Sequence, residues 1–431
     1  MEGRASYLLS LRAIRIVTLL YFNDYLDDQG LSKTMNKIKN ALLFILAKIL
    51  TASSPGATYL AFAGSGSSAQ LCAHIRRSGF KRVLVVTDKP LRELGIVDRA
   101  LEGFAGSDID IAFYDGVEPD PTFDQVAEGL AELKKHNSDV VLAIGGGSSI
   151  DCAKLVAARA TSDEDPRNWI GFGKVKHEVL PIFAIPTTAG TGSEATMGAV
   201  ISDPVTHEKG VISGAGLGMG ATALDPDLQL GMPPAITAAT GMDALTHAVE
   251  TVICRWDRGT SKEHAKRAIR IIFENLTRAY DQGDDAEARE SMALASYYAG
   301  IAINQVNVGS VHAIAHQLGG KYQIPHGLAN AMVLPHVLNY CAAEAEGALA
   351  ELAQLIGVAA SGQSAGDQAR AFIDAVIQLR DDVGIPATSE KIKAEDFDYL
   401  VDLAVAEGTG YFPPKMLDKA GARDILSKIA G

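Results

Sequence analysis

Cysteine is scarce in this chain of 431 residues, which contains four. Cys72, Cys152, Cys254 and Cys341 stand singly, and no two of them form a C-x-x-C pair. This spacing argues against a disulfide framework and against a cysteine-rich zinc site. We therefore expect a protein of the reducing cytoplasm.

Positive charge is also in short supply. The chain has 39 Lys and Arg against 52 Asp and Glu, a formal net charge of −13, and a pI near 5.3. Proteins that bind the phosphate backbone of nucleic acids usually carry a basic patch or stripe. A nucleic-acid partner is therefore not expected.

Long apolar runs are missing as well. The segment "ALLFILAKIL" at 41–50 contains a lysine and is too short to span a bilayer. The segment "RAIRIVTLLYF" at 12–22 begins like a secretion signal, but the charged "NDYLDDQG" follows it instead of a small-residue cleavage site. We expect no membrane association, and we interpret residues 1–56 as an N-terminal helical extension that packs on the body or contacts a partner.

An alternation of apolar strands and helical stretches fills residues 57–231. Continuous apolar strands that alternate with helices indicate a parallel sheet covered on both faces, here a Rossmann-like α/β domain that binds a dinucleotide. The strands are predicted at 57–64, 82–88, 109–115, 139–147 and 180–188.

Residues 232–431 have a different character, because stretches rich in Ala, Leu, Glu and Arg replace the strands. Apolar residues spaced three and four apart predict helices. The predicted helices are 235–256, 259–281, 285–317, 336–356 and 366–382. We expect this part to be an all-α domain.

Two glycine-rich turns could receive a dinucleotide. "GSGSSA" at 64–69 fits the G-x-G-x-x-A variant, and Asp88 ends the next strand, where a carboxylate binds the adenosine ribose and favours NAD over NADP. "GGGSSID" at 145–151 joins another strand to a helix whose N-terminus could bind a diphosphate. Either turn alone could equally be a tight βα connection, and Asp88 could simply cap the next helix.

Histidines and an aspartate recur at helical spacing in the second half. His312 and His316 are four residues apart, as are Asp243 and His247, so each pair lies on one helix face. His326 follows on a "PHG" turn. A lone histidine is more often a core residue, but two such pairs with a further histidine predict a site for Fe(II), Zn(II), Mn(II), Ni(II) or Co(II).

Seven motifs taken in order resemble the iron-containing (group III) alcohol dehydrogenase family over residues 57–431. They are "VVTDK", "VEPDPT", "GGGSSIDCAK", "IPTTAGTGSEAT", "LDPDL", "GMDALTHAVE" and "GSVHAIAHQLGGKYQIPHGLANAMVLPHVLNY". The resemblance implies a dinucleotide-binding α/β domain followed by a helical metal domain. It places the metal ligands on Asp243, His247, His312 and His326, with Fe(II) first and Zn(II) second, and puts His316 near the substrate and the nicotinamide.

The same resemblance assigns the cofactor contacts. It places the NAD diphosphate on the turn at 145–151, so the turn at 64–69 becomes an ordinary strand-to-helix junction. The implied contacts are Asp88, Asp120, Gly146, Gly147, Ser148, Asp151, Thr187, Thr188, Thr191 and Lys209. Asp120 departs from the family, which often has Asn there, and residues 1–56 have no counterpart in it.

The function implied is reversible hydride transfer between a primary alcohol, or its aldehyde, and NAD at a divalent metal. His316 is the candidate proton shuttle, or else a residue that positions the substrate. Two alternatives are a lyase resembling dehydroquinate synthase, which lacks the "GMDALTHA" and "PHGLANA" context, and a non-catalytic NAD-binding regulator, against which the complete ligand set argues. The resemblance leaves the alcohol unidentified, and we expect a homodimer or a higher homo-oligomer.

Overall fold

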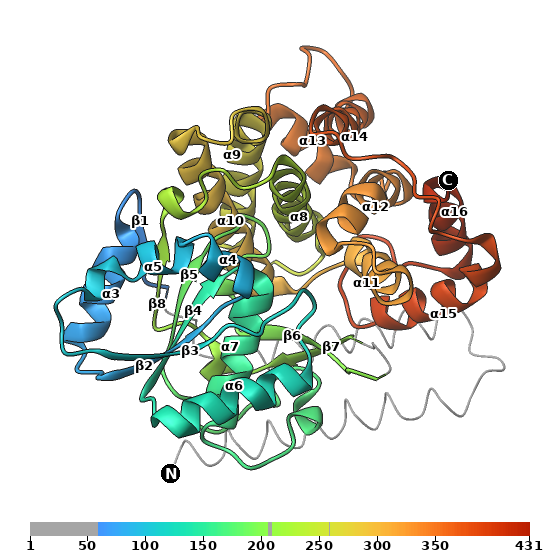
Figure 1. The fold of residues 1–431 in the computed structure, drawn as a ribbon. Coiled ribbons are helices and arrows are strands. Elements are labelled where there is room, and N and C mark those ends of the chain that lie inside the picture. The colour runs from blue at the N-terminus through green and yellow to red at the C-terminus, as the bar shows by residue number, and fades with distance from the viewer. Residues whose placement is uncertain (1–58, 206–208, 258) are drawn as a thin grey trace, which may run out of the picture. The chain divides into compact units, whose positions relative to one another are not determined.

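The computed structural model describes residues 59–205, 209–257 and 259–431. The predicted N-terminal extension at 1–56 lies outside the described residues. Residues from Tyr59 to Gly431 belong to one compact unit, within which an α/β part precedes a helical part (Figure 1).

A six-stranded parallel sheet organises the α/β part, as the alternating pattern predicted. The strand order is β1-β8-β5-β4-β2-β3, and every neighbouring pair is parallel. The strands are β1 (Ala61–Ala63), β2 (Arg82–Val86), β3 (Asp110–Tyr114), β4 (Val140–Gly145), β5 (Ile182–Pro186) and β8 (Ala221–Leu224). Their carboxyl ends share one edge, where open α/β sheets bind their ligands.

Both faces of the sheet are buried, which explains why the strands read as unbroken apolar runs. Along β4, Val141 and Ala143 join one core cluster while Leu142 and Ile144 join the other. Helices α6 (Phe123–His136) and α7 (Gly147–Arg159) cover the first face. Helices α3 (Ser67–Arg77), α4 (Lys89–Glu93) and α5 (Ile96–Ala100) cover the second (Figure 1).

An antiparallel hairpin that the sequence analysis did not predict follows β5. Its strands are β6 (Gly198–Ser202) and β7 (Lys209–Ser213). Each strand is five residues long and includes a glycine, so neither carries a strong strand pattern. The hairpin matters for the site because β7 begins with Lys209.

Helices alone make up the regular secondary structure described after β8, apart from isolated bridges, which confirms the all-α prediction. The helices are α8 (Pro234–Ile253), α9 (Ser261–Asp281), α10 (Ala286–Val306), α11 (Ser310–Tyr322), α12 (His326–Tyr340), α13 (Glu346–Leu355), α14 (Ala365–Asp382), α15 (Phe397–Gly408) and α16 (Lys419–Ile429). α8 runs through the centre and packs against α9, α10 and α12 (Figure 1).

Two predicted helices were wrong in their extent. The stretch predicted as 285–317 is two helices, because Asn307 adopts a left-handed φ of 69° and ends α10. The stretch predicted as 336–356 is also divided, since α12 ends at Tyr340 and α13 begins at Glu346. The first break is the one that lets α11 turn toward α8.

The structure also bears on the cysteines and on the apolar helices. All four cysteines are free and buried. Among the described helices, none combines the length and the apolar character needed to cross a bilayer.

Candidate active site

The four side chains proposed as metal ligands come together in the helical part. Asp243 and His247 extend from α8, His312 from α11 and His326 from α12. One ligand atom from each of the four lies within 4.8 Å of the others. Oδ1 of Asp243 lies 3.5 Å from Nε2 of His326 and 4.0 Å from Nε2 of His312.

Close packing of two helices brings His326 into the cluster. His326 was predicted on a turn, but it is the first residue of α12. A Cβ built on the next residue, Gly327, would lie 2.1 Å from the carbonyl oxygen of Ala239 in α8. Only glycine allows this approach, which sets the N-terminus of α12 beside Asp243.

The protonation of the cluster suits a cation. Burial favours the neutral form of Asp243, but the neighbouring histidines outweigh burial and hold the pKa of this carboxyl below its usual range. Burial keeps the pKa of His312 well below its ordinary value and lowers the pKa of His326 to about 3. Two neutral imidazoles and an ionised carboxylate therefore offer lone pairs near neutral pH.

The donor set fits a divalent transition metal. Ligand atoms bound at about 2.1 Å to one ion lie within about 4.2 Å of each other, so the cluster would close on an ion by small side-chain movements. Nδ1 of His247 is buried and has no hydrogen-bond partner among the described residues. Three imidazoles with one carboxylate and no thiolate suit Fe(II) or Zn(II).

Two residues that the sequence analysis missed orient the ligands. Oε2 of Glu250, a residue one helical turn after His247 in α8, lies 2.6 Å from Nδ1 of His312 and is hydrogen-bonded to it. Asn330, one turn after His326 in α12, donates through Nδ2 to Oδ1 of Asp243 at 2.7 Å. Their helical spacing from predicted ligands was the signal that could have identified both residues.

His316 lies beside the cluster. Its ring is stacked on that of His326, with centroids 5.3 Å apart, and meets that of His312 edge-on at 5.7 Å. Its Nδ1 is 2.6 Å from Oε1 of Glu407, a residue of α15 that lies 91 positions away in the chain and that no motif connects with it. The structure therefore places His316 next to the proposed ligands.

The turn after β4 has the form of an anion cradle. Gly146 is the N-cap of α7 and makes no side-chain cap, so the first amides of this helix have no capping side chain. A Cβ on Gly147 would lie 2.7 Å from Cγ2 of Thr191, and one on Gly146 would lie 3.3 Å from Oγ1 of Thr188. Ser148 follows, half-buried, in the same helical turn.

Three other residues predicted to contact the cofactor have structural partners at this edge. Thr187 is buried, and its amide donates to the carbonyl of Gly145 at 3.0 Å. Oδ1 of Asp88 accepts a hydrogen bond from the amide of Leu91 and so caps α4. Asp151 is buried, with hydrogen bonds from the Ser193 hydroxyl and the Val200 amide. Asp151 thus joins α7 to the segment that contains Ser193 and Val200.

Asp120 and Lys209 meet each other across the edge of the sheet. Nζ of Lys209 is 2.6 Å from Oδ1 of Asp120, and the two side chains are 13% and 53% exposed. The same Nζ lies 3.4 Å from the Cβ position built on Gly319 of α11. Lys209 therefore reaches from the hairpin to the helix that carries His312.

The other glycine-rich turn, at 64–69, has its amides bound by a side chain of the protein. Asp225, which follows β8, accepts hydrogen bonds from the amide of Gly66 at 3.3 Å and from the amide and hydroxyl of Ser68 at 3.0 and 2.6 Å. A buried carboxylate thus sits where a phosphate would bind. This turn is an internal junction, although its glycine spacing fits the generic fingerprint better.

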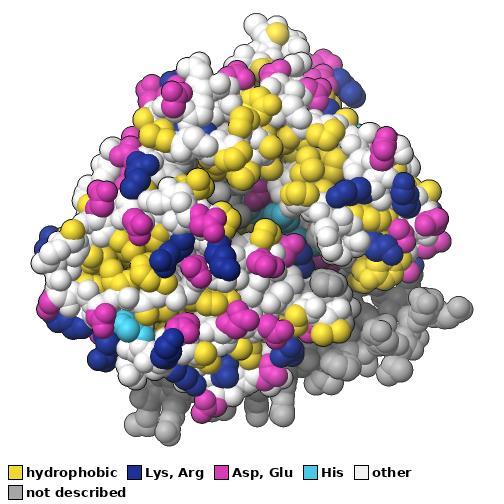
Figure 2. All heavy atoms as spheres, viewed as in Figure 1, with side chains coloured by type: hydrophobic (Ala, Val, Ile, Leu, Met, Phe, Trp, Pro, Cys, Tyr) yellow, Lys and Arg dark blue, Asp and Glu magenta, His cyan; other side chains and the backbone are white. Residues whose placement is uncertain are grey.

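The cluster opens into a hollow between the two parts. Figure 2 shows this hollow, with histidine and acidic side chains inside it. The side chain of His326 is 29% exposed and that of His316 is 14% exposed, whereas Asp243 and His312 are almost fully buried. The cluster is therefore accessible to solvent from the side of His316 and His326.

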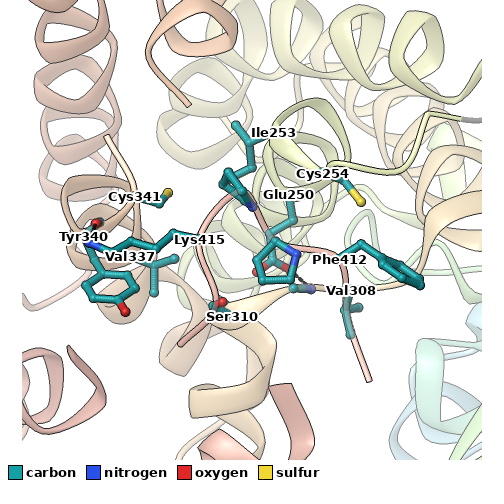
Figure 3. Close-up of a pocket in the computed structure, with 13 residues that line it drawn as sticks. Glu250, Ile253, Cys254, Val308, Ser310, Val337, Tyr340, Cys341, Phe412 and Lys415 are labelled. Carbon is teal, nitrogen blue, oxygen red and sulfur yellow. Dashed lines mark hydrogen bonds between the residues drawn. The ribbon is translucent and has the colours of Figure 1, made fainter. Parts of the chain in front are cut away.

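A separate cavity adjoins the site through Glu250. Cys254, Tyr340, Cys341 and Lys415 are among the residues around it (Figure 3). None of the four proposed ligands is among the described residues that line it. This cavity is not the place where the cation would bind.

Comparison with known proteins identifies the family. The iron-containing alcohol dehydrogenase family matches residues 60–226, and the C-terminal domain of the Fe-containing alcohol dehydrogenase family matches residues 237–430. The chain is 41% identical to 1,3-propanediol dehydrogenase of Klebsiella pneumoniae over 341 residues, 78% of this chain and 88% of the relative. It is 38% identical to lactaldehyde reductase of Escherichia coli K12 over 328 residues, 76% of this chain and 85% of the relative.

Solved structures agree with this result. A crystal structure of 1,3-propanediol oxidoreductase superimposes with a TM-score of 0.83 at 38% identity, covering 87% of this chain and all of the other. An alcohol dehydrogenase from Oenococcus oeni gives the same TM-score and coverage at 34% identity. The chain belongs to the iron-containing alcohol dehydrogenase family, and it is an oxidoreductase that acts on CH–OH groups.

Proposed function

We propose that the protein catalyses the NAD-linked oxidation of a short primary alcohol or diol, and the reverse reduction of the aldehyde, at a bound divalent cation. The observation that carries the proposal is the cluster of Asp243, His247, His312 and His326, which His316 contacts and whose member His326 is close enough to Lys209 to feel its charge. Relatives named for 1,3-propanediol, lactaldehyde and methanol support a small substrate.

Each group has a defined part in this proposal. The four-residue cluster would hold the cation, with Fe(II) first and Zn(II) second, and the glycine turn at 145–147 with Thr188 and Thr191 would hold the NAD diphosphate. When bound, the cation supplies Lewis-acid polarisation of the substrate oxygen, and the nicotinamide supplies the hydride acceptor.

The chain's own residues complete the chemistry. His316 holds or releases the proton of the substrate hydroxyl, since its side chain lies beside the cluster, is partly accessible and is hydrogen-bonded to Glu407. Lys209 contributes positive charge near the cofactor phosphates. Asp88 lies two residues after β2, as the N-cap of α4, where a carboxylate repels a 2′-phosphate, and this favours NAD over NADP.

The test combines metal content with turnover. Wild-type protein reconstituted with Fe(II) or with Zn(II) should reduce NAD in the presence of 1,3-propanediol or another short primary alcohol. His312→Ala should lose both the bound metal and the NADH signal, while His74→Ala, a histidine change in the α/β part, should keep the metal. Unchanged metal content and rate in His312→Ala would exclude the proposed site.

Net formation of NADH also separates this proposal from a lyase reaction, in which NAD is not consumed. An alcohol panel that yields no NADH with any substrate, from protein that holds its metal, would contradict the proposed function.

A further inference from the structure

We infer that Glu407, with Tyr411, is the positioning residue for His316: it holds the imidazole with one nitrogen bound to the protein and the other left for the reacting groups. This inference rests on the proposed function, because it assigns His316 its orientation at the same site. Glu407 lies in the last turn of α15, 91 residues from His316 in the sequence.

The carboxylate of Glu407 is surrounded by hydrogen-bond donors. Oε1 is 2.6 Å from Nδ1 of His316 and accepts from the hydroxyl of Tyr411 at 2.6 Å. Oε2 accepts from Nε2 of Gln317 at 2.7 Å. The three donors come from α11 and from the segment after α15, so the carboxylate joins two separate segments around the imidazole.

This set of contacts decides which nitrogen of His316 carries the proton. Burial alone would favour a neutral Glu407, but the bonds from His316, Tyr411 and Gln317 hold the pKa of this carboxyl below its ordinary value. An ionised carboxylate only accepts hydrogen bonds. Both oxygens of the carboxylate already accept hydrogen bonds, from Tyr411 and from Gln317, so we assign the donor role to Nδ1–H of His316, and Nε2 of the neutral ring then keeps the lone pair.

The ring that Glu407 holds is the one beside the proposed ligands. It is nearly parallel to the ring of His326, with an interplanar angle of 20°, and edge-on to that of His312, at 69°. A half-turn about χ2 would place Cδ2 of His316, a carbon, where Nδ1 now faces Glu407, and would abolish this arrangement. A fixed ring matters because displacement of a reacting group by about 1 Å can cost about a hundredfold in rate.

A purely structural role explains Glu407 poorly. An acidic residue in the last turn of a helix opposes the helix dipole, and α15 has no basic residue in that turn. Glu407 is not among the residues grouped around the cation position. One of its three hydrogen-bond partners is the ring of His316, and we therefore assign Glu407 a role that acts through this ring.

The experiment uses the zinc-loaded full-length enzyme and its Glu407→Ala, Glu407→Gln and Tyr411→Phe variants. We expect kcat of Glu407→Ala to fall about tenfold to a hundredfold, with KM for NAD and the zinc content within a factor of two. Glu407→Gln keeps an acceptor at Oε1, so it should recover most of the rate. The control is Asp402→Ala, which removes an exposed carboxylate from the same helix and should leave kcat unchanged.

A second readout does not depend on turnover. In ¹⁵N-histidine spectra of the zinc-loaded protein, with His316 assigned through His316→Asn, the wild type should show the Nδ1–H form, and Glu407→Ala should lose it. An Nε2–H signal in the wild type, or an unchanged kcat in Glu407→Ala, would overturn the inference. If no alcohol yields NADH while the Nδ1–H signal is present, the proposed function fails and the positioning of His316 stands.

Discussion

Oε2 of Glu250 lies 2.6 Å from Nδ1 of His312, and the same carboxyl group closes the N-terminus of the helix that carries this histidine. It accepts hydrogen bonds from the amides of Gly309 at 2.8 Å and Val311 at 2.7 Å. α11 has no side-chain cap of its own. One residue of α8 therefore fixes both the start of α11 and the ring of His312.

Glu250→Gln should weaken metal binding. Glutamine has one acceptor oxygen, and its NH2 group would face an amide N–H of Gly309 or Val311 that is now bound by a carboxylate oxygen. The start of α11 and the ring of His312 would then lose their fixed position. We expect the Kd for Zn(II) to rise about tenfold to a hundredfold, measured by competition with a chromophoric chelator. Glu351→Gln, an exposed glutamate on α13, is the control, and equal affinities in the two variants would refute the assignment.

Gly327→Ala should destabilise the protein and loosen the metal site together. The new Cβ would lie 2.1 Å from the carbonyl oxygen of Ala239, a backbone atom that cannot move aside cheaply. We expect a loss of about 1–3 kcal/mol in stability and weaker metal binding, because α12 carries His326. Gly347→Ala, at a helical glycine with no atom within 4 Å of the added Cβ, should instead be neutral or slightly stabilising in the same thermal melts.

Asp120→Asn should strengthen NAD binding. Asp120 pairs with Lys209 at 2.6 Å, so it withholds part of that positive charge from an anionic ligand. The pair is half-exposed and solvent-screened, which limits the effect to about 1 kcal/mol, or roughly fivefold in Kd. Fluorescence titration with NADH at low and high salt measures it. Asp108→Asn, which breaks the exposed pair with Lys81, should not change the affinity; weaker NADH binding by Asp120→Asn would contradict the assignment.

The sheet and the grouping of the proposed ligands could be predicted because both depend on local patterns. A strand with two buried faces must be apolar throughout, and side chains four apart on a helix must share a face. The break between α10 and α11 could not be predicted in this way. Asn307 interrupts the helix at a left-handed φ of 69°, and the apolar spacing continues across it.

Contacts between segments far apart in the chain could not be predicted from the sequence. Glu407 and His316 are 91 residues apart, and Asp225 and Ser68 are 157 apart. The second pair is instructive, because the turn at 64–69 matches a phosphate-binding fingerprint that encodes backbone shape alone. Its amides are bound by Asp225, which directly follows β8. The local sequence of the turn does not contain that information.

Glu194 makes the stability of the protein depend on pH. It is 4% exposed, and burial raises the pKa of this carboxyl from 4.5 to about 7, although its own amide and the buried Lys154 oppose the rise. The folded state therefore binds a proton that the unfolded state releases above pH 4.5. This contribution to stability is complete below pH 4.5 and is lost as the pH rises to about 7.

Glu194→Gln should remove this dependence, because the amide resembles the protonated carboxyl at every pH. We expect the variant to be more stable than the wild type by about 1–3 kcal/mol at pH 8 and nearly equal to it at pH 5. Melting temperatures at pH 5, 6, 7 and 8 measure the difference, with Glu102→Gln, an exposed glutamate, as the control. If the melting temperatures of wild type and Glu194→Gln changed in parallel with pH, the prediction would be wrong. Glu194 would then be ionised in the folded protein across this range, with its charge balanced by the buried ammonium of Lys154.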